Sequence, residues 1–503
     1  MSANPQDHAA DELRESNLAT GLPGTIDLDK VMADIGIGRF HYQILWLFGV
    51  GFSACAIEVV LMAFLLPELR ARWKLDEYQL GLLAASSSVA SILGQMFWGA
   101  VADKYGRRFV FMSTVLVVAL FGGLSALSQT ALFLICMRSA VAFGIGGNIS
   151  VDFSLYTEFM PTEGRGRMLL CMQAFWPLGQ LVTCLAAWWI IPGSGWRVFV
   201  VACTVPSLLT GFFRPFIPES PRWLVLHGRA EEATQVCRKM AIKNGHRPED
   251  LGLKEGVMVD LPTNSVTPLV VSGSSLVKKG KTKPEGSLAG KLFNSQYGCT
   301  TVGTILFSAA LHAVSYGSMT FLPSMLERKG IHSGDKYFFM VLNSVSEFPG
   351  VFGIMALSHL LGRLFPMKVS LLVIALSFLI FSMAQESAGI LTCVCLNAVF
   401  IESGWACYHT YLPEVYPTEM RATATGFVNS VACMMSALVP LCAAYFLDRY
   451  GVDKACMFFA AVALVGSIGS FLFLHVETHD RDLEDVVTRK DGSAKIPLDD
   501  RAC

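Results

Sequence analysis

Long apolar runs alternate with short charged stretches over most of the chain. A run of about 20 apolar residues is long enough to cross the hydrocarbon core of a bilayer as a helix. Such runs are found near 43–66, 79–102, 109–129, 131–157, 168–191 and 197–217, and again near 299–323, 338–361, 365–385, 389–413, 422–447 and 454–475. The pattern predicts an all-α membrane protein with twelve transmembrane helices in two six-helix bundles.

Polar segments before, between and after the apolar runs complete the expected organisation. We expect a cytoplasmic N-terminal segment (1–42), a first bundle (43–217), a cytoplasmic central loop (218–298), a second bundle (299–475) and a cytoplasmic tail (476–503). Within the central loop, Ala230 to Asn244 has helical periodicity, and a tether rich in Ser, Lys and Gly follows it. This loop is predicted to join the bundles rather than to form a domain.

Basic residues in the short loops indicate the orientation, because loops rich in Lys and Arg stay on the cytoplasmic side. The basic loops that share one side contain Lys104, Arg107, Arg108, Arg165, Arg167, Arg363, Lys368 and Arg421. The first loop, with Arg70, Arg72 and Lys74, is an exception on the other side. We therefore expect both termini in the cytoplasm, with the first helix as an uncleaved signal, in the plasma membrane or a vesicle membrane.

Composition supports the membrane assignment and argues against several other classes. The chain has 503 residues, of which 53% are hydrophobic and 16% charged, and its net charge is −1. This balance argues against a nucleic-acid surface, which needs clustered excess Lys and Arg. Most of the 14 cysteines lie in apolar runs and are interpreted as small hydrophobic side chains. No phosphate-binding loop or nucleophilic triad is evident, so we expect no cofactor, no metal and no enzymatic activity.

A charged hinge, Gly99-Ala100-Val101-Ala102-Asp103-Lys104-Tyr105-Gly106-Arg107-Arg108, separates the second and third apolar runs. It either sets the orientation only or forms a cytoplasmic gate, in which Asp103 pairs with a group of the other bundle. Matching charges follow the fourth, sixth and tenth helices, either as ordinary loop ion pairs or as gate salt bridges. The gate candidates are Gly99, Asp103, Gly106, Arg107, Arg108, Arg138, Glu158, Arg165, Glu219, Arg222, Glu414 and Arg421.

Ionisable and polar residues inside the apolar runs are candidates for solute or proton binding. Glu58 lies near the middle of the first run, where a carboxylate is costly unless it faces a cavity or a partner. Asp152 and Glu402 are expected near a membrane interface instead. The alternative for each residue is a structural hydrogen bond between helices. The candidates are Glu58, Asn148, Gln173, His312, Tyr316, Asn343, Glu347, Glu402, Trp405 and His409.

Four motifs resemble those of the major facilitator superfamily. The charged hinge resembles the loop between its second and third helices, and Arg138 with Gly144, Gly146 and Gly147 resembles its fourth-helix pattern. Pro218–Trp223 and Tyr411–Thr418 resemble the elements after the sixth and tenth helices. A closer resemblance, to the synaptic vesicle 2-related branch, comes from Ile35–Phe40, Phe143–Gly147 and Ser346–Val351.

The resemblance implies two bundles around one central cavity and transport by rocker-switch alternating access. The implied solute is a small organic cation, zwitterion or carboxylate, with proton coupling at Glu58 as a hypothesis, carried by a monomer. A sugar porter is one alternative, suggested by Pro218–Arg222, Gln173 and Gln180. A vesicle-membrane protein that binds partners without transport is the other.

Some positions differ from the pattern of the branch. Cys55 stands where the branch usually has an aspartate, and Glu402 lies near the expected place of an arginine. The second-half copy of the hinge, His359 to Leu364, lacks the acid and the last cation. We therefore predict that the first-half hinge dominates gating, so that Asp103→Asn impairs transport far more than His359→Asp.

Overall fold

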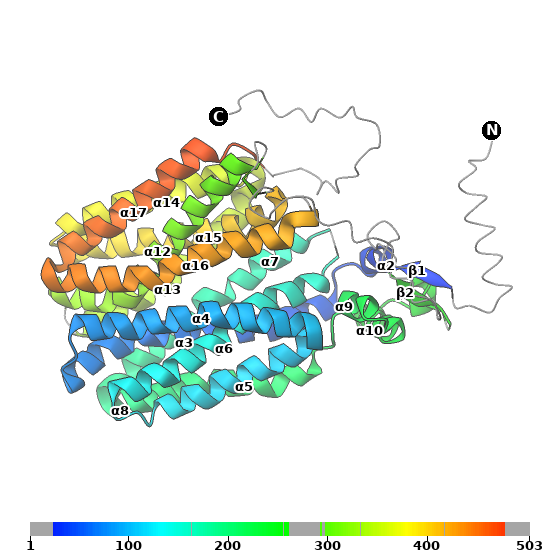
Figure 1. Ribbon diagram of the computed structural model, residues 1–503, viewed down its shortest axis with the longest axis horizontal. Coiled ribbons are helices and arrows are strands. Elements are labelled where there is room, and N and C mark those ends of the chain that lie inside the picture. Colours follow the sequence, from blue (N-terminus) through cyan, green and yellow to red (C-terminus); the bar gives the residue numbers. More distant parts are fainter. Residues whose placement is uncertain are drawn as a thin grey trace.

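The computed structural model describes residues 24–161, 163–254, 256–260, 292–293, 297–331, 333–416 and 418–477. Most of these residues lie in long helices that run along the longest axis of the molecule (Figure 1). Most of the N-terminal segment, most of the predicted tether and almost all of the predicted tail lie outside the described residues. The description below therefore concerns the helical body and the structured elements at one of its ends.

The first half of the body contains the predicted helices one to six. They are α3 (Arg39–Trp73), α4 (Glu77–Tyr105), α5 (Arg107–Ser125), α6 (Ala131–Glu158), α7 (Arg165–Gln173) and α8 (Phe175–Phe213). The continuous helical stretch Arg165–Phe213 has 49 residues, about 73 Å at 1.5 Å per residue, which is more than two bilayer cores. Gly195 breaks it with a φ of 79°, so α7 and α8 together make two crossings.

The second half contains six further long helices. They are α12 (Gly298–Arg328), α13 (Ser333–Leu361), α14 (Leu364–Met383), α15 (Ser387–Val415), α16 (Thr418–Arg449) and α17 (Gly451–Phe473). Counted as continuous helices, 11 described segments are long and apolar enough to cross a membrane. Because one of these segments crosses twice, the twelve predicted transmembrane helices are confirmed.

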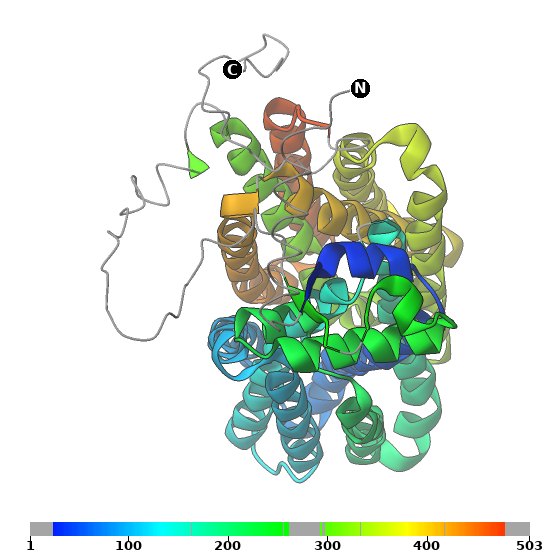
Figure 2. The ribbon, with the colours of Figure 1, turned by 90° about the vertical axis from the view of Figure 1, so that its right-hand side faces the viewer.

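Short elements cover one end of the first half, which we call the α10 end (Figure 2). They are β1 (Thr25–Asp27), α2 (Leu28–Ile35), α9 (Pro221–Leu226), α10 (Ala230–Asn244), the 3-10 turn η2 (Pro248–Leu251) and β2 (Met258–Asp260). The strands pair in parallel, with Thr25 opposite Met258. The helix predicted over Ala230–Asn244 is present with those bounds. Residues 24–36, 221–254 and 256–260 thus fold together, an arrangement that the sequence analysis did not predict.

The apolar core shows how the two halves meet. One large cluster joins the second part of α3, Ile57 to Leu69, with buried residues of α12 to α17. A second cluster joins the first part of α3, Phe40 to Phe52, with α2 and α10, and its described members all precede residue 260. The halves therefore share their apolar core mainly at the end opposite α10.

Candidate functional site

A central cavity of about 260 Å³ lies between the two halves and is the candidate solute site. Helices of both halves line it, as alternating access requires. Of the ten predicted binding residues, nine line this cavity: Glu58, Gln173, His312, Tyr316, Asn343, Glu347, Glu402, Trp405 and His409. Asn148 is buried elsewhere in the first half. Glu402 is 5% exposed in the middle of α15, so its expected place near a membrane interface was wrong.

A buried ion pair from the first half forms part of the cavity wall. Arg138 Nη1 on α6 lies 2.7 Å from Glu58 Oε2 on α3, and its Nη2 donates to the Glu58 carbonyl at 2.5 Å. The two side chains are 3% and 0% exposed. Arg138 therefore belongs to the cavity and not to the charged cluster at the α10 end, which corrects its assignment to the gate. It lies only two turns into α6, at the end opposite α10.

Two carboxylates from the second half lie near each other in the same cavity. Glu347 accepts a hydrogen bond from Gln180 of the first half and one from Asn343 Nδ2 at 3.2 Å. Glu402 packs against Gly350, where an added Cβ would lie 3.2 Å from the Glu402 Cβ. Gly350 is one turn beyond Glu347 on α13, which brings the two acids together. The described hydrogen-bond partners of Glu347 are neutral amides, which do not compensate the negative charge of an ionised carboxylate.

Aromatic side chains form the wall beside these acids. The Trp405 ring lies 4.6 Å from the His312 ring and 5.3 Å from the His409 ring, between centroids. Its Nε1 donates to Ser315 Oγ at 2.8 Å, which fixes the indole. Tyr316 packs 6.0 Å from His312. Such a wall can hold a cation against its electron-rich ring faces.

The rim of the cavity toward the α10 end connects the two halves. Gln173 on α7 is hydrogen-bonded to His409 on α15, and the Phe153 ring of α6 lies 5.7 Å from the same imidazole. Phe52 packs 5.2 Å from Phe153 and 5.1 Å from Trp176. Solute that leaves toward the α10 end must therefore separate or pass these contacts.

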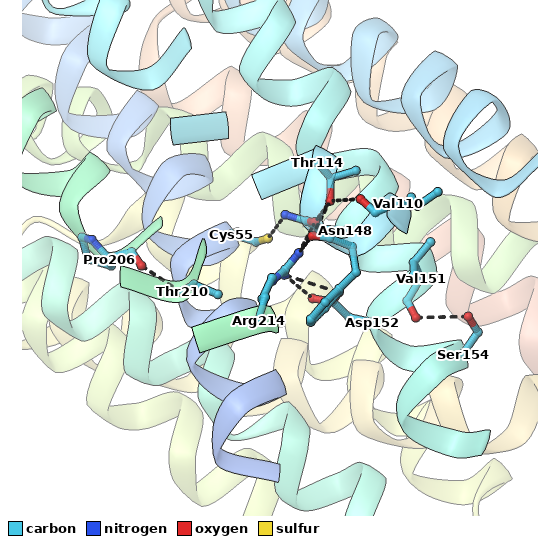
Figure 3. A network of polar contacts seen from close by, with 11 residues as sticks. Cys55, Val110, Thr114, Asn148, Val151, Asp152, Ser154, Pro206, Thr210 and Arg214 are labelled. Carbon is cyan, nitrogen blue, oxygen red and sulfur yellow. Dashed lines mark hydrogen bonds and ion pairs between the residues drawn. The ribbon is translucent and has the colours of Figure 1, made fainter. Parts of the chain in front are cut away.

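A second buried ion pair lies within the first half, apart from the cavity lining (Figure 3). Arg214 Nη2 lies 3.3 Å from Asp152 Oδ2, and Arg214 Nη1 donates to Asn148 Oδ1 at 3.0 Å. Thr114 also bonds this oxygen, and Asn148 Nδ2 donates to Cys55 Sγ at 3.5 Å. Asn148 thus orients a buried arginine and, unlike the other nine candidates, lies outside the cavity lining, so its role in solute binding stays a prediction.

Arg214 is a residue that the sequence analysis missed. It is 1% exposed, and its guanidinium carbon lies 3.4 Å from the centroid of the Phe111 ring. The available signal was an arginine inside the predicted sixth apolar run, 197–217, where a charge needs a partner. Asp152, expected near an interface, is 0% exposed and supplies that partner.

Two glutamates cap equivalent helices at the α10 end. Glu219 accepts the amide N–H groups of Arg107 and Arg108 at 3.2 and 3.1 Å, at the start of α5. Glu477 accepts those of Arg363 and Leu364, both at 3.0 Å, at the start of α14. A carboxylate is favourable there because the first N–H groups of a helix have no partner within the helix. The two hinges are therefore built alike, although their sequences differ.

The ion pairs described at this end join residues of the same half. Arg107 Nη2 lies 3.0 Å from Glu158, and Arg363 Nη1 lies 2.6 Å from Glu414. Arg222 pairs with Asp29 of α2, and Arg165 donates to the Met160 carbonyl at 3.1 Å. The side chains of Asp103, His359 and Arg421 lie outside the described part of the structure, so the bridge between halves and the predicted asymmetry stay predictions.

Both hinges need glycine, which gives the first testable expectation. Gly106 and Gly362 have φ angles of 98° and 67°, and an added Cβ would lie 2.6 and 2.7 Å from the capping carboxylates of Glu219 and Glu477. We expect Gly106→Ala and Gly362→Ala each to lower the unfolding free energy by about 1–2 kcal/mol, from left-handed strain alone. Thermal unfolding in detergent measures this.

Gly99, also assigned to the gate, is the control for these substitutions. It lies within α4, and an added Cβ there would meet no atom within 4 Å. Gly99→Ala should leave the melting temperature unchanged or raise it, because alanine favours a helix over glycine. Equal losses of unfolding free energy in the alanine variants of all three glycines would contradict the capping interpretation.

Comparison with known proteins gives one family match and many relatives. Residues 48–488 match the family model described as sugar (and other) transporter. The chain is 30% identical to organic cation/carnitine transporter 7 of Arabidopsis thaliana, over 92% of this chain and 96% of that protein. It is 26% identical to the niacin transporter NiaP of Acinetobacter baylyi, over 92% and 100% of the two chains. The synaptic vesicle 2-related protein of Xenopus laevis is also 26% identical, over 94% and 85%.

Solved structures give the same fold. The partially occluded inward-open structure of the xylose transporter XylE from E. coli matches with a TM-score of 0.68 and 15% identity. The match covers 87% of this chain and 100% of that one. At this identity the likeness concerns the arrangement of the helices.

Proposed function

Since this chain belongs to the sugar (and other) transporter family of the major facilitator superfamily, and so transports small organic solutes, we propose that its solute is an organic cation held in the central cavity. The chain is a multi-pass membrane protein that also resembles the synaptic vesicle 2-related proteins. Rocker-switch alternating access moves the solute across the membrane between the two halves.

The pair of Glu347 and Glu402 carries this proposal. Both carboxylates line the cavity, where two like charges repel strongly at low dielectric. A bound cation relieves that repulsion, and the ring of Trp405 offers it a second attractive contact. The Glu58–Arg138 pair is neutral overall, so it leaves the excess negative charge of the acids uncompensated. The name of the Arabidopsis relative agrees with a cationic solute.

Proton coupling is proposed at Glu58. This carboxylate contributes to both an ion pair and the cavity wall, so a proton on it changes the charge that the solute meets. Protonation also releases Arg138 from its salt bridge, which couples the proton to the arrangement of α3 and α6. A difference in solute affinity between the two protonation states is what coupling requires.

A sugar porter is the second candidate, because amides line the cavity and can bind hydroxyl groups. In this structure Gln180 is bonded to Glu347, and Gln173 to His409. Both amides therefore have protein partners, which favours the cation. A vesicle protein that only binds partners is distinguished from both by the absence of uptake.

The membrane orientation belongs to the same proposal. We assign the α10 end to the cytoplasm, with both termini there, in the plasma membrane or a vesicle membrane. The support is the gathering of basic loops at this end, among them those with Arg107, Arg165 and Arg363. The protein acts as a monomer, with no enzymatic activity.

Uptake by proteoliposomes tests the function. We expect the full chain to take up radiolabelled organic cations, with hexoses and carboxylates as the comparison solutes. Glu402→Gln should lower cation uptake about thirtyfold or more, since removing one partner of a buried charge contact costs about 2–5 kcal/mol. Glu386→Gln, exposed at the start of the same helix, should leave it unchanged.

The possible outcomes separate the candidates. Hexose uptake that exceeds cation uptake would favour the sugar porter. Equal cation uptake by Glu402→Gln and wild type would contradict the role of the acid pair. A folded protein that takes up no solute of the panel would favour the binding protein.

A further inference from the structure

A second cavity, of about 900 Å³, opens on the outer surface of the first half at the α10 end. We call it the interfacial groove. It lies between the start of α5, the turn η1 (Arg214–Phe216) that ends α8, and helices α9 and α10. Neither the solute cavity nor the buried Arg214 network uses it.

One side of the groove is apolar and exposed. Phe109, Met112 and Phe216 are 54%, 38% and 71% exposed. Phe109 and Met112 lie in the first two turns of α5, a membrane-crossing helix, and Phe216 lies just after α8. These side chains are therefore positioned where the hydrocarbon of the bilayer begins. Large exposed apolar side chains at that depth fit acyl chains rather than water.

The other side of the groove is basic. Helix α10 buries Ala233, Cys237 and Met240 against its neighbours, and Lys239 and Lys243, one turn apart, are exposed along the groove. The two ammonium groups thus face the groove from the cytoplasmic side in the proposed orientation.

The charges around the groove leave it positive. Arg229 is held by Glu232 at 2.6 Å, and the carboxylate of Glu219 caps α5. Lys243 donates to the amide oxygen of Gln43 at 3.0 Å, which is a neutral partner. Counting Arg108, Arg229, Lys239 and Lys243 against Glu219 and Glu232, the titratable lining has four cations and two anions.

We propose that the interfacial groove binds one anionic phospholipid. Its phosphate contacts Lys239 and Lys243, and the upper part of an acyl chain lies along Phe109, Met112 and Phe216. An anionic surface attracts basic segments beside a membrane helix, and an acyl chain adds apolar contact. The bound lipid ties α10 to the start of α5, which is the hinge that Glu219 caps. This site is independent of the solute that the central cavity carries.

Native mass spectrometry of the full chain in mild detergent tests the site without any measurement of transport. Phosphatidylglycerol and phosphatidylcholine with identical acyl chains are titrated separately. We expect wild type to bind the anionic lipid about tenfold more tightly or better, because each lysine near an anionic lipid contributes roughly fivefold. The double variant Lys239→Gln with Lys243→Gln should lose that preference and keep its affinity for phosphatidylcholine.

Three controls complete the experiment. Lys254→Gln, an exposed change at the same end outside the groove lining, should behave as wild type. Phe216→Ser should weaken binding of both lipids, as the apolar side predicts. Inorganic phosphate at the lipid concentration should not displace phosphatidylglycerol. Displacement by phosphate, equal binding of the two lipids by wild type, or an unchanged preference in the double variant would overturn the proposal.

Discussion

Replacing Arg214 by Met is expected to lower the unfolding free energy by about 3–5 kcal/mol, because it leaves a buried carboxylate without its partner. Asp152 would lose the guanidinium that lies 3.3 Å away, in a region where its side chain is 0% exposed. The Phe111 carbonyl and Asn148 Oδ1 would each lose a donor as well. A change of this size should prevent the isolation of folded protein or lower its melting temperature strongly.

The double variant Arg214→Met with Asp152→Asn is the informative comparison. Removing the second charge should restore much of the stability, since paired buried charges often exchange for neutral groups at little cost. The single variant Arg214→Lys should be less stable than wild type, because one ammonium group cannot reproduce the contacts that a planar guanidinium makes on two sides. Arg167→Met, at an exposed position, is the control. A single variant as stable as wild type would refute the structural role of the pair.

The membrane helices could be predicted from sequence because their cause is local. A bilayer requires each crossing to be long and apolar, and the windows locate all twelve. The break between the fifth and sixth helices at Gly195 falls between the predicted windows 168–191 and 197–217. The small structure at the α10 end was not predictable in this way. Its strands have three residues each, too few for a periodic pattern, and their partners lie more than 200 residues apart.

The site could be predicted as a set of residues but not as a set of partners. The search for polar residues in apolar runs found nine residues that line the cavity. It works because a polar or charged side chain inside a membrane helix is costly unless it has a partner or a function. Pairing depends on tertiary geometry. Arg138 meets Glu58 across 80 residues of sequence, and Asn148 is bonded to Arg214 outside the cavity lining.

The two hinges illustrate the same limit. Their sequences suggested an unequal pair, because the second lacks an acid and a cation. The described contacts add a feature that both hinges share, a glycine at positive φ and a glutamate on the next helix N-terminus, while the predicted asymmetry stays a prediction. Glu219 and Glu477 come from segments after the sixth and twelfth helices, so each hinge depends on residues more than 100 positions away.

Replacing Glu58 by Gln is expected to abolish accumulation driven by a pH gradient while leaving solute exchange intact. A glutamine amide carries no titrating proton, so the carrier can only equilibrate its solute. The Glu58 carbonyl still accepts from Arg138 Nη2, and the amide oxygen can accept from Nη1, so the fold should persist. The measurement is the internal-to-external solute ratio in proteoliposomes with the membrane potential clamped at zero.

Comparing variants of the Glu58–Arg138 pair and the Asp152–Arg214 pair distinguishes an effect on protein stability from an effect on proton coupling. Glu68→Gln, a change at a half-buried position on the same helix outside the cavity lining, removes an ion pair with Arg72 and should accumulate solute as wild type does. The Arg214→Met, Asp152→Asn double variant alters charges outside the cavity lining, so once folded it should still respond to the gradient. Accumulation of solute by the Glu58→Gln protein would show that Glu58 does not carry the coupled proton. Loss of coupling in the double variant as well would show that both pairs along α6 act in the proton step.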